Sequence, residues 1–459
     1  MRIDRLGDLG SPAEVLRAVA AGAQRAGLPP PAALTGEWFG SRAVIAPTVR
    51  STPVGERACW PAGAPLSSDF STRSPTDGTV GGGWIGYRAY PDGAGSRIPA
   101  AAGGWTDCVL RCDADGVWWY ESLSGARMPD WLAAGIAVPV GAGPWRIRWT
   151  PPDAGVHRAG VLACLDAIAA GEVYQACICT QFTGAVSGAP LDFFADAVDA
   201  TGPARAAYLA GDWGAVASLS PELFLRRRGK ALCSSPIKGT LPLHSDPADL
   251  RASVKDVAEN IMIVDLVRND LGRVAVTGSV AVPELLAVHA APGVWHLVST
   301  VCAHVPADLP MTDILEATFP PASVTGTPKI RARELLSEWE PRNRGVYCGA
   351  VGLASPVAGT ELNVAIRTVE FDAAGGAVLG VGGGITADSD PDAEWQECLH
   401  KAAATVGLTS AADIGRAYPG NAPRISHSAI TPAPAPPHHR VHASAARRDW
   451  PRSPARKRP

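Results

Sequence analysis

The chain has 459 residues, of which 46% are hydrophobic, and its 41 Lys and Arg residues are nearly balanced by 44 Asp and Glu, for a formal net charge of −3. This length can bury a sizeable core without disulfide or metal support, and the charge balance excludes a broadly basic nucleic-acid-binding protein. No run of about 18 residues is apolar and free of Gly, Pro and charge, and the first residues lack the apolar stretch of a secretory signal. We therefore expect no nucleic-acid partner, no membrane span and a cytoplasmic location.

Composition divides the chain into three parts. Residues 1–150 predict short strands between Gly-rich turns, for example at 78–90 and 116–120. Residues 151–410 alternate strong helices with strands. The last part, 419–459, is rich in Pro and Ala and carries eight Arg or Lys against one Asp. We expect it to be a disordered basic tail, with a tail that touches RNA or a membrane as the alternative.

The second part opens with a clear helix-to-strand pattern. The apolar spacing of Val161, Leu165 and Ile168 predicts one face of a helix, and Gly171 suits the position just after its end. The run at 172–182 then predicts a strand. Three further helices follow, interrupted by strands; their ranges are 254–272, 329–340 and 392–408.

The helix at 329–340 has a recognisable start. Thr327 is a candidate N-cap, and Pro328 suits the first helical position. The strands expected around these helices lie at 346–355, 360–372 and 377–387.

The ten cysteines are scattered without a CxxC pair. We expect reduced and mostly buried thiols, as is usual for a protein without a secretory signal. Cys177 and Cys179 would share one face of a strand, where two thiols more often pack than bind a metal.

Two helices carry pairs of acids spaced i, i+3. Asp256 and Glu259 form one pair, and Glu394 and Glu397 form the other. Carboxylates on two otherwise apolar helix faces can meet around a hard cation, and Mg²⁺ prefers oxygen ligands. The alternative is that both pairs lie on solvated helix faces.

Three other patterns suit an anionic substrate. Gly380 and 382–384 let backbone N–H groups approach an anion closely, although a structural turn explains them equally well. Residues 325–327 open a helix and form a second such position. Lys238 lies among small and apolar residues, where desolvation would lower its pKa and make it a nucleophile or base; the alternative is a surface cation.

Taken together, these patterns resemble the chorismate-utilising enzymes, which include component I of aminodeoxychorismate synthase and of anthranilate synthase. The resemblance covers about residues 150–410. Its fold implies an α/β, more specifically α+β, protein: a large two-layer sandwich of antiparallel-rich sheets with helices outside. The matching stretches, in family order, are SLSPELFLRR (218–227), SSPIKGT (234–240), ENIMIVDLVRNDLGRV (259–274), VWHLVSTV (294–301), FPPASVTGTPKIRARELLSEWEP (319–341), VYCGAVG (346–352), LNVAIRT (362–368) and GGGITADSDPDAEWQECLHKA (382–402).

The resemblance assigns roles to individual residues. It implies Mg²⁺ as cofactor, with Glu259 and Glu397 as direct ligands and Asp256 and Glu394 as their support. Chorismate is a dianion, and Arg geometry suits its carboxylates. The residues implied to bind the substrate are Thr240, Thr325, Gly326, Tyr347, Arg367, Gly383, Gly384 and Lys401.

The catalytic residues follow from the same resemblance. Glu222 matches the acid that protonates the departing C4 hydroxyl, and His296 matches the histidine beside that leaving group. Lys238 matches a lysine of the aminodeoxychorismate branch that attacks C2 of chorismate, after which ammonia attacks C4 and expels the lysine. Anthranilate synthases usually carry alanine there. Members that use water carry a lysine base where this chain has Gln175, which argues against isochorismate chemistry.

The implied partners are chorismate, ammonia and a separate glutaminase subunit, because the sequence contains no G-x-C-x-G nucleophile turn. The product would be 4-amino-4-deoxychorismate. Two alternatives stay open: component I of anthranilate synthase, and a non-catalytic chorismate-binding paralogue. Ala176 and Cys177 also depart from the Val-Asn found in many relatives, which leaves the substrate contacts there open.

Overall fold

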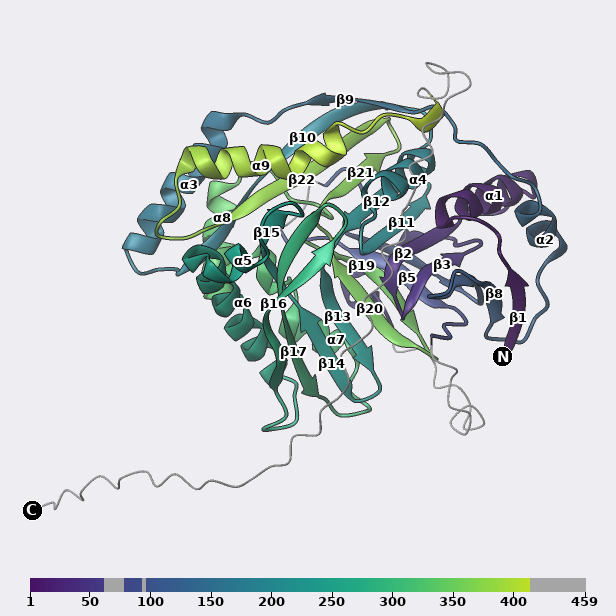
Figure 1. The fold of residues 1–459 in the computed structure, drawn as a ribbon, viewed down its shortest axis with the longest axis horizontal. Helices are drawn as coiled ribbons and strands as arrows, with labels where there is room; N and C mark the ends of the chain where they lie inside the picture. Colours follow the sequence, from purple (N-terminus) through teal and green to yellow (C-terminus); the bar gives the residue numbers. More distant parts are fainter. Residues whose placement is uncertain (62–77, 93–95, 413–459) are drawn as a thin grey trace, which may run out of the picture.

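Two antiparallel sheets form the framework of the computed structural model, which describes residues 1–61, 78–92 and 96–412 (Figure 1). The tail expected at 419–459 lies outside the described residues. The first sheet has twelve strands. In spatial order they are β1 (Arg2–Gly7), β8 (Trp118–Ser122), β7 (Cys108–Cys112), β3 (Ser41–Ala46), β2 (Ala32–Trp38), β11 (Arg205–Gly211), β12 (Gly214–Ser220), β21 (Thr368–Asp372), β22 (Gly376–Ile385), β10 (Gln175–Ser187) and β18 (Gly326–Thr327), with β9 (Arg146–Thr150) also paired to β10.

The second sheet has ten strands. Their order is β15 (Ile237–Pro242), β17 (Val294–His304), β14 (Ala231–Ser235), β13 (Leu223–Arg228), β20 (Gly359–Val364), β19 (Ala350–Ser355), β5 (Gly83–Arg88), β6 (Ala101–Thr106) and β4 (Thr52–Pro53), with β16 (Ala281–Ala291) also paired to β17. Strands from both sides of residue 150 belong to each sheet, since β2 pairs with β11 and β5 pairs with β19.

The sheets pack face to face through alternating apolar side chains. Leu34 and Val216 of the first sheet belong to the same buried cluster as Ile85 and Val351 of the second. Apolar area removed from water is worth about 25 cal/mol per Å², so this interface is a main source of stability. The expected two-layer sandwich is confirmed.

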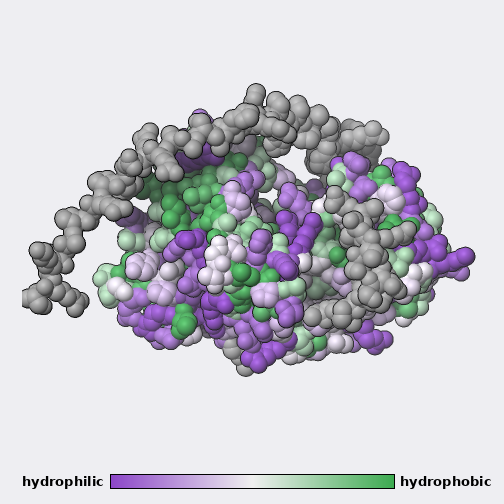
Figure 2. Space-filling model, turned by 90° about the horizontal axis from the view of Figure 1, so that it is seen from below, coloured by the Kyte–Doolittle hydropathy of each residue, from purple (hydrophilic) through white to green (hydrophobic). Residues whose placement is uncertain are grey.

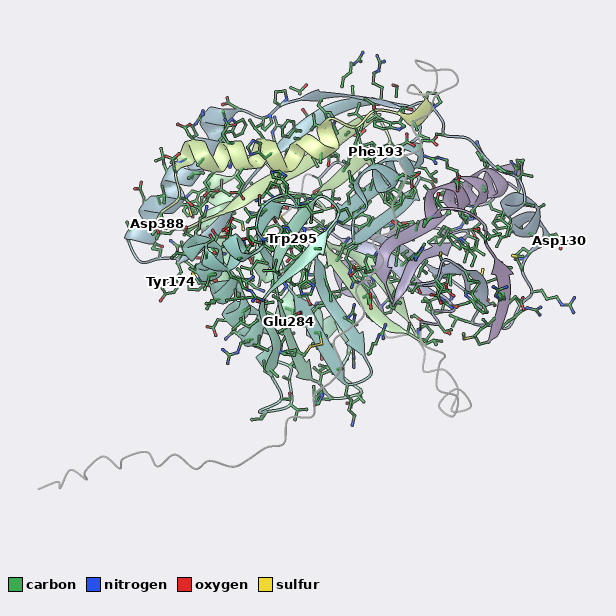
Figure 3. All side chains as sticks on the ribbon, viewed as in Figure 1. Asp130, Tyr174, Phe193, Glu284, Trp295 and Asp388 are labelled. Carbon is green, nitrogen blue, oxygen red and sulfur yellow. A yellow bond between two sulfur atoms is a disulfide. The ribbon has the colours of Figure 1, made fainter. Side chains whose placement is uncertain are left out.

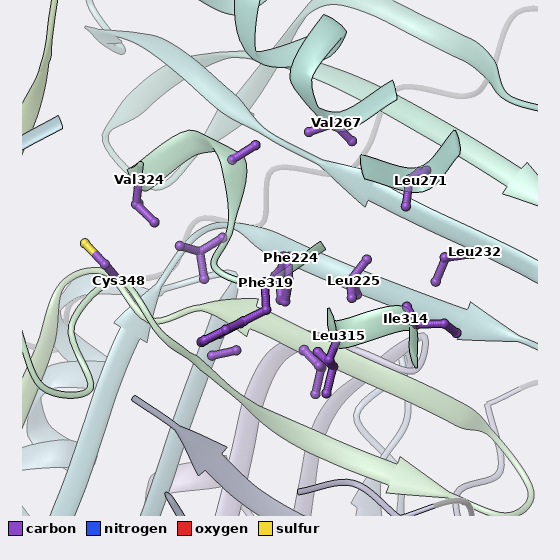
Figure 4. Close-up of a cluster of buried hydrophobic side chains, with 14 of the residues drawn as sticks. Phe224, Leu225, Leu232, Val267, Leu271, Ile314, Leu315, Phe319, Val324 and Cys348 are labelled. Atoms are coloured by element: carbon purple, nitrogen blue, oxygen red, sulfur yellow. The ribbon is translucent and has the colours of Figure 1, made fainter. Parts of the chain in front are cut away.

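Helices cover the outer faces, as expected. The helices are α1 (Pro12–Arg25), α2 (Asp130–Ile136), α3 (Ala154–Ala169), α4 (Pro190–Thr201), α5 (Ala248–Ala252), α6 (Val254–Gly272), α7 (Met311–Thr318), α8 (Lys329–Trp339) and α9 (Pro391–Val406). Figure 4 shows how α6 and α7 cover the second sheet: Val267 and Leu271 from α6 and Ile314 from α7 lie against Leu225 and Leu232. Seen from below, hydrophilic side chains cover much of the surface, while apolar residues gather in one area at the upper left of the view and are scattered elsewhere (Figure 2).

Local sequence signals placed most of the second part correctly. The helix expected at 254–272 is α6, and Gly171 follows the end of α3 with a φ of 77°, a left-handed conformation that favours glycine. The helix start expected at Thr327 is wrong. The cap position is Pro328, which makes no side-chain hydrogen bond. Thr327 instead lies in β18 and pairs with Gln175 of β10.

The strand expected at 377–387 is confirmed as β22, so the glycines at 380 and 382–384 lie inside a strand and the alternative of a turn does not apply. One other expectation changes. The run at 360–372 is divided into β20 and β21 by a bend at Arg367, which has a φ of 50°.

The cysteines are not all reduced. Cys233 and Cys302 stand opposite each other on β14 and β17 and form a disulfide, drawn as a yellow bond in Figure 3. The other eight are free thiols, and all except Cys108 are buried. No helix in the described ranges is long and apolar enough to cross a membrane.

Candidate active site

The residues singled out in the sequence converge where α6 and α9 face β15, β22 and β10. In Figure 1, α9 runs along β22 and β10, and α6 lies below them next to β15. Glu259 of α6 and Glu397 of α9 lie beside the same glycine pair of β22. Within each helix, the i, i+3 spacing places the two acids of a pair on one face. Segments separated by more than 100 residues thus meet in one charged cluster.

Carboxylates and amines alternate in this cluster. Lys238 Nζ lies 3.8 Å from Glu259 Oε2, and Lys255 Nζ lies 3.9 Å from Glu259 Oε1 and 3.0 Å from Glu394 Oε1. Both glutamate side chains are less than a tenth exposed. Burial raises the pKa of Glu259 despite its two lysine neighbours.

The third glutamate is more open. Glu397 lies 2.6 Å from Lys401 Nζ, which also donates to the Gly382 carbonyl at 2.9 Å. Burial alone would raise the pKa of Glu397, but the charges of Lys401, Lys255 and Lys238 together lower it. Lys401, expected to hold a substrate carboxylate, is thus paired with Glu397 here.

Bare backbone brings β22 into this cluster. A Cβ on Gly383 would lie 3.0 Å from Glu394 Oε2, and a Cβ on Gly384 would lie 3.2 Å from Lys238 Nζ and 3.4 Å from Glu259 Oε2. A side chain at either position would crowd the ends of these charged side chains, which would have to shift by a few tenths of an ångström. This close approach is how the glycines contribute to the site.

The donor set of the cluster fits Mg²⁺. Its acceptors are carboxylate oxygens, and Glu394 Oε2 is buried without a hydrogen-bond partner. Glu259, Glu394 and Glu397 surround the same glycine pair, although within the described ranges no three acidic, His or Cys side chains already form a metal-binding group. Asp256 stands one helical turn before Glu259; its backbone N–H is capped by Ser253, and its side chain approaches Gly239.

Lys238 lies inside the cluster, but its protonation differs from expectation. Its side chain is 11% exposed. Burial lowers its pKa, yet the nearby Cys177, Glu259, Glu222 and Glu397 outweigh this effect, so the pKa of Lys238 is raised. The expected lowered pKa is therefore wrong: the surrounding carboxylates favour the ammonium form.

Glu222 fits the role of an acid. It directly precedes β13, and its backbone is fixed by bonds to Ser220 and to Val364 of β20. The residue is 3% exposed, and burial raises the pKa of its carboxyl group to about 7 even though Lys238 opposes the shift. Glu222 can therefore carry a proton near neutral pH.

His296 is a neutral imidazole. Its Nδ1 lies 2.9 Å from Thr240 Oγ1, its cross-strand neighbour on β15. Burial and the charge of Arg367 lower the pKa of His296 to about 4. Thr240, expected to touch the substrate, therefore orients this ring.

The remaining residues expected to bind the substrate differ in whether their polar groups are already paired within the protein. Arg367 makes no ion pair with any described residue, and burial lowers its pKa. The Tyr347 ring lies directly over Gly380, where a Cβ would be 2.2 Å from it. Thr325 donates its hydroxyl to Pro321 and Ala322 within its own turn, and Gly326 packs against the Gln175 backbone.

Two residues of the cluster were not among the expected site residues. Gln175 is fully buried, and neither its amide oxygen nor its amide nitrogen has a partner in the described structure. The oxygen lies 3.9 Å from the position of a Cβ on Gly384. Lys255 bridges Glu259 and Glu394, and its i, i+4 spacing from Glu259 was a signal available in the sequence.

Comparison with known proteins gives a consistent result. A family model described as chorismate binding enzyme matches residues 144–407. The chain is 41% identical over 283 residues to the aminodeoxychorismate synthase component 1 of Klebsiella aerogenes, covering 59% of this chain and 62% of the relative. It is 39% identical over 246 residues to the anthranilate synthase component 1 of Streptomyces coelicolor, covering 52% and 48%.

Solved structures agree on the fold. The anthranilate synthase component I from Streptococcus pneumoniae TIGR4 matches with a TM-score of 0.63 and 26% identity, covering 73% of this chain and 82% of that one. The menaquinone-specific isochorismate synthase of Escherichia coli gives the same TM-score at 20% identity and covers 88% of this chain and 94% of that one. At this identity the match shows only that the two proteins share a fold. The chain matches between 52% and 62% of the length of three relatives named aminodeoxychorismate synthase component 1. Because the family model covers more than half of the chain, this protein belongs to the chorismate binding enzyme family.

Proposed function

We propose that this chain is the component 1 subunit of an aminodeoxychorismate synthase and aminates chorismate at C4. The observation that carries the proposal is the position of Lys238. This lysine, where anthranilate-forming relatives usually have alanine, lies within the acidic cluster, 3.8 Å from Glu259. The relatives named aminodeoxychorismate synthase component 1, at 41–44% identity, support the same branch.

The described groups support a two-stage reaction. The deprotonated amine of Lys238 bonds to C2 of chorismate, the two conjugated ring double bonds each shift one position towards C4, and the C4–O bond breaks. Glu222, whose pKa of about 7 lets it hold a proton, gives its proton to the departing oxygen, which leaves as water. Ammonia then bonds to C4, both double bonds shift back, and the bond from C2 to Lys238 breaks to free the lysine amine. The new ammonium group at C4 returns one proton to the Glu222 carboxylate.

Other residues bind and orient the substrate. Arg367, a buried cation without an ion pair in the described structure, suits one of the two carboxylates. Neutral His296, held by Thr240, offers a ring nitrogen beside the leaving group. Glu259 and Glu397, supported by Glu394 and Asp256, would hold Mg²⁺, which when bound supplies positive charge next to the other carboxylate.

Gln175 argues against attack by water. A glutamine amide cannot take a proton from water near neutral pH, so the lysine-dependent route of water-using relatives has no base at this position. The buried amide can instead form hydrogen bonds with a neutral nucleophile. Ammonia supplied by a separate glutaminase subunit is the nucleophile we propose.

The test is the product of the purified chain with chorismate, Mg²⁺ and ammonium, identified by mass and fluorescence. We expect 4-amino-4-deoxychorismate. Anthranilate as the main product would assign the chain to the other branch. Saturable chorismate binding without turnover would indicate a non-catalytic paralogue.

A further inference from the structure

One edge of β10 has a gap in its strand pairing. On one side, β10 pairs with β22 along almost its whole length. On the other side it pairs with β18 only at Gln175 and Ala176, and with β9 only from Thr183 onward. The stretch 177–182 therefore has no strand beside it on this edge within the described structure. Residues 177–179 of this stretch are buried, so their backbone groups need other partners.

A buried ion pair fills this gap. Arg344 Nη2 donates to the Cys177 carbonyl at 2.7 Å, and Glu340 Oε1 accepts from the Cys179 N–H at 3.0 Å. The two side chains also pair with each other, with Arg344 Nε and Nη2 at 2.7 and 2.6 Å from the carboxylate oxygens. They expose only 2% and 9% of their side chains. The pair thus supplies the donor and the acceptor that a neighbouring strand would provide.

The same guanidinium reaches a second segment of the site. Arg344 Nη1 donates to the Val324 carbonyl at 2.7 Å. The next residue, Thr325, accepts from the Cys177 N–H at 2.7 Å. The guanidinium lies 4.4 Å from the centre of the Tyr90 ring, which restricts its position. Arg344 therefore connects β10 to the turn that leads into β18.

Only arginine can make this set of contacts. Its planar group carries five N–H donors in fixed directions, whereas a lysine ammonium at the end of a flexible chain cannot reach two carbonyls and both carboxylate oxygens together. A buried ion pair adds little net stability compared with apolar residues of similar size. The contribution of this pair therefore lies in geometry.

We infer that Arg344, supported by Glu340, is a positioning residue that fixes the site-facing residues of β10 relative to the turn at 324–326. On β10 those residues are Gln175, whose amide oxygen lies 3.9 Å from the position of a Cβ on Gly384, and Cys177, which stands opposite Gly384 in the strand pairing. The effect on activity rests on the proposed function. The effect on the backbone does not.

The experiment compares Arg344→Lys with Arg342→Lys. Arg342 lies two residues earlier and, like Arg344, lines a cavity beside residues 178–181 of β10. It is exposed, so its variant makes the same chemical change without breaking the contacts. Amide hydrogen exchange is followed by mass spectrometry in peptides that cover 175–182 and 322–327. A peptide covering β11 serves as the internal reference. Turnover of chorismate with ammonium is measured on the same preparations.

For Arg344→Lys we expect exchange about tenfold faster or more in these two peptides, with β11 unchanged. We expect KM for chorismate to rise on the order of tenfold, with a smaller change in kcat, because misplaced binding groups mainly weaken substrate binding. Arg342→Lys should match the wild type in both measurements. Faster exchange throughout the chain, or none at 175–182, would overturn the inference, and so would local loosening with unchanged KM.

Two features keep the test decisive. If Arg344→Lys does not fold, Glu340→Gln serves in its place, because the amide oxygen still accepts from Cys179 while the bidentate pairing with Arg344 is lost. If the wild type does not turn over chorismate, the proposed function fails. The exchange measurement then still decides whether the pair holds β10 in place.

Discussion

At the scale of single residues, the site depends on how burial and charge set protonation. Burial dominates the pKa of Glu222 and raises it, whereas for Lys238 the charges of the surrounding acids outweigh the effect of burial. Their pKa values therefore move in the same direction for different reasons. The sequence predicted both residues by resemblance. It did not predict the raised pKa of Lys238, because that depends on acids from three distant segments.

Replacing Lys238 tests the branch directly. Lys238→Ala removes the nucleophile, so we expect the formation of 4-amino-4-deoxychorismate to fall at least about 100-fold. Lys238→Arg keeps the charge in the cluster but stays protonated, and it should be equally inactive. Product analysis by mass checks both variants. Retention of the wild-type rate in either one would rule out a covalent role for this lysine.

The raised pKa of Glu222 predicts a pH dependence. The active form needs a protonated Glu222 and a deprotonated Lys238, so kcat/KM should rise about tenfold per pH unit below about pH 7 and level off above it, where loss of the Glu222 proton offsets the gain in free lysine amine. The concentration of free NH₃ is held constant across the series, because it also changes with pH. Glu222→Gln should be slow, and its rate should keep rising through pH 7 without this break. Glu370→Gln is the matched control and should keep the break, since burial also raises the pKa of Glu370 to about 7; a wild-type profile without a break near pH 7 would contradict the assignment.

At the scale of elements, local patterns and long-range pairing differ in what a sequence reveals. Helix α6 was predicted with its bounds because its apolar spacing and the Gly at its end are local signals. The pairing of Thr327 with Gln175 and the disulfide between Cys233 and Cys302 depend on which strands meet across 152 and 69 residues. Helix and strand periodicity carry no information about such pairings.

Alanine substitutions at two glycines of β22 are expected to have different effects: one crowds the site, and the other damages the fold. A Cβ on Gly384 would meet the flexible end of Lys238 at 3.2 Å, whereas one on Gly382 would meet the Ile178 carbonyl at 2.6 Å. We expect Gly384→Ala to keep the wild-type Tm and lose activity at least tenfold. Gly382→Ala should lose about 1–3 kcal/mol of stability, because rigid backbone must move. Thermal unfolding and initial rates measure the two effects, and full activity in Gly384→Ala would show that Lys238 is not crowded during turnover.

The two acidic helix faces make a separate prediction about metal. We expect Mg²⁺ to bind the folded chain in calorimetric titrations, and Glu397→Gln to weaken binding at least tenfold without changing Tm, since one charged oxygen ligand is lost. Glu338→Gln, a matched change on α8, which lies outside the cluster, should bind like the wild type. Turnover that continues in excess chelator would contradict a requirement for the ion.

At the scale of the whole molecule, the site exists because two sheets bring distant segments together. Residues from α6, α9, β10, β15 and β22 span more than 200 positions, yet five of the expected site residues lie within one charged cluster. These are Lys238, Glu259, Glu394, Glu397 and Lys401. The resemblance to the family identified these five residues, whereas the spacing of the acids alone also allowed solvated helix faces. The Arg344–Glu340 pair was not anticipated, because nothing in the sequence shows that β10 lacks a neighbour at 177–182.

The intact molecule also predicts how its nitrogen must be supplied. In the proposed reaction free NH₃ is the nucleophile, and since the pKa of ammonium is near 9, only about 1% is NH₃ at neutral pH. The described free thiols are unsuited to glutamine hydrolysis, because burial raises the pKa of Cys59 to about 12 and of Cys108 and Cys112 to about 11. The purified chain should therefore use ammonium salts, better as the pH rises from 7 to 8, and be nearly inactive with glutamine. Adding a glutaminase subunit should restore use of glutamine, measured as product formed at pH 7 with and without that subunit. Turnover of glutamine by the chain alone, at a rate comparable to that with saturating ammonium, would contradict this dependence and direct attention to those three cysteines.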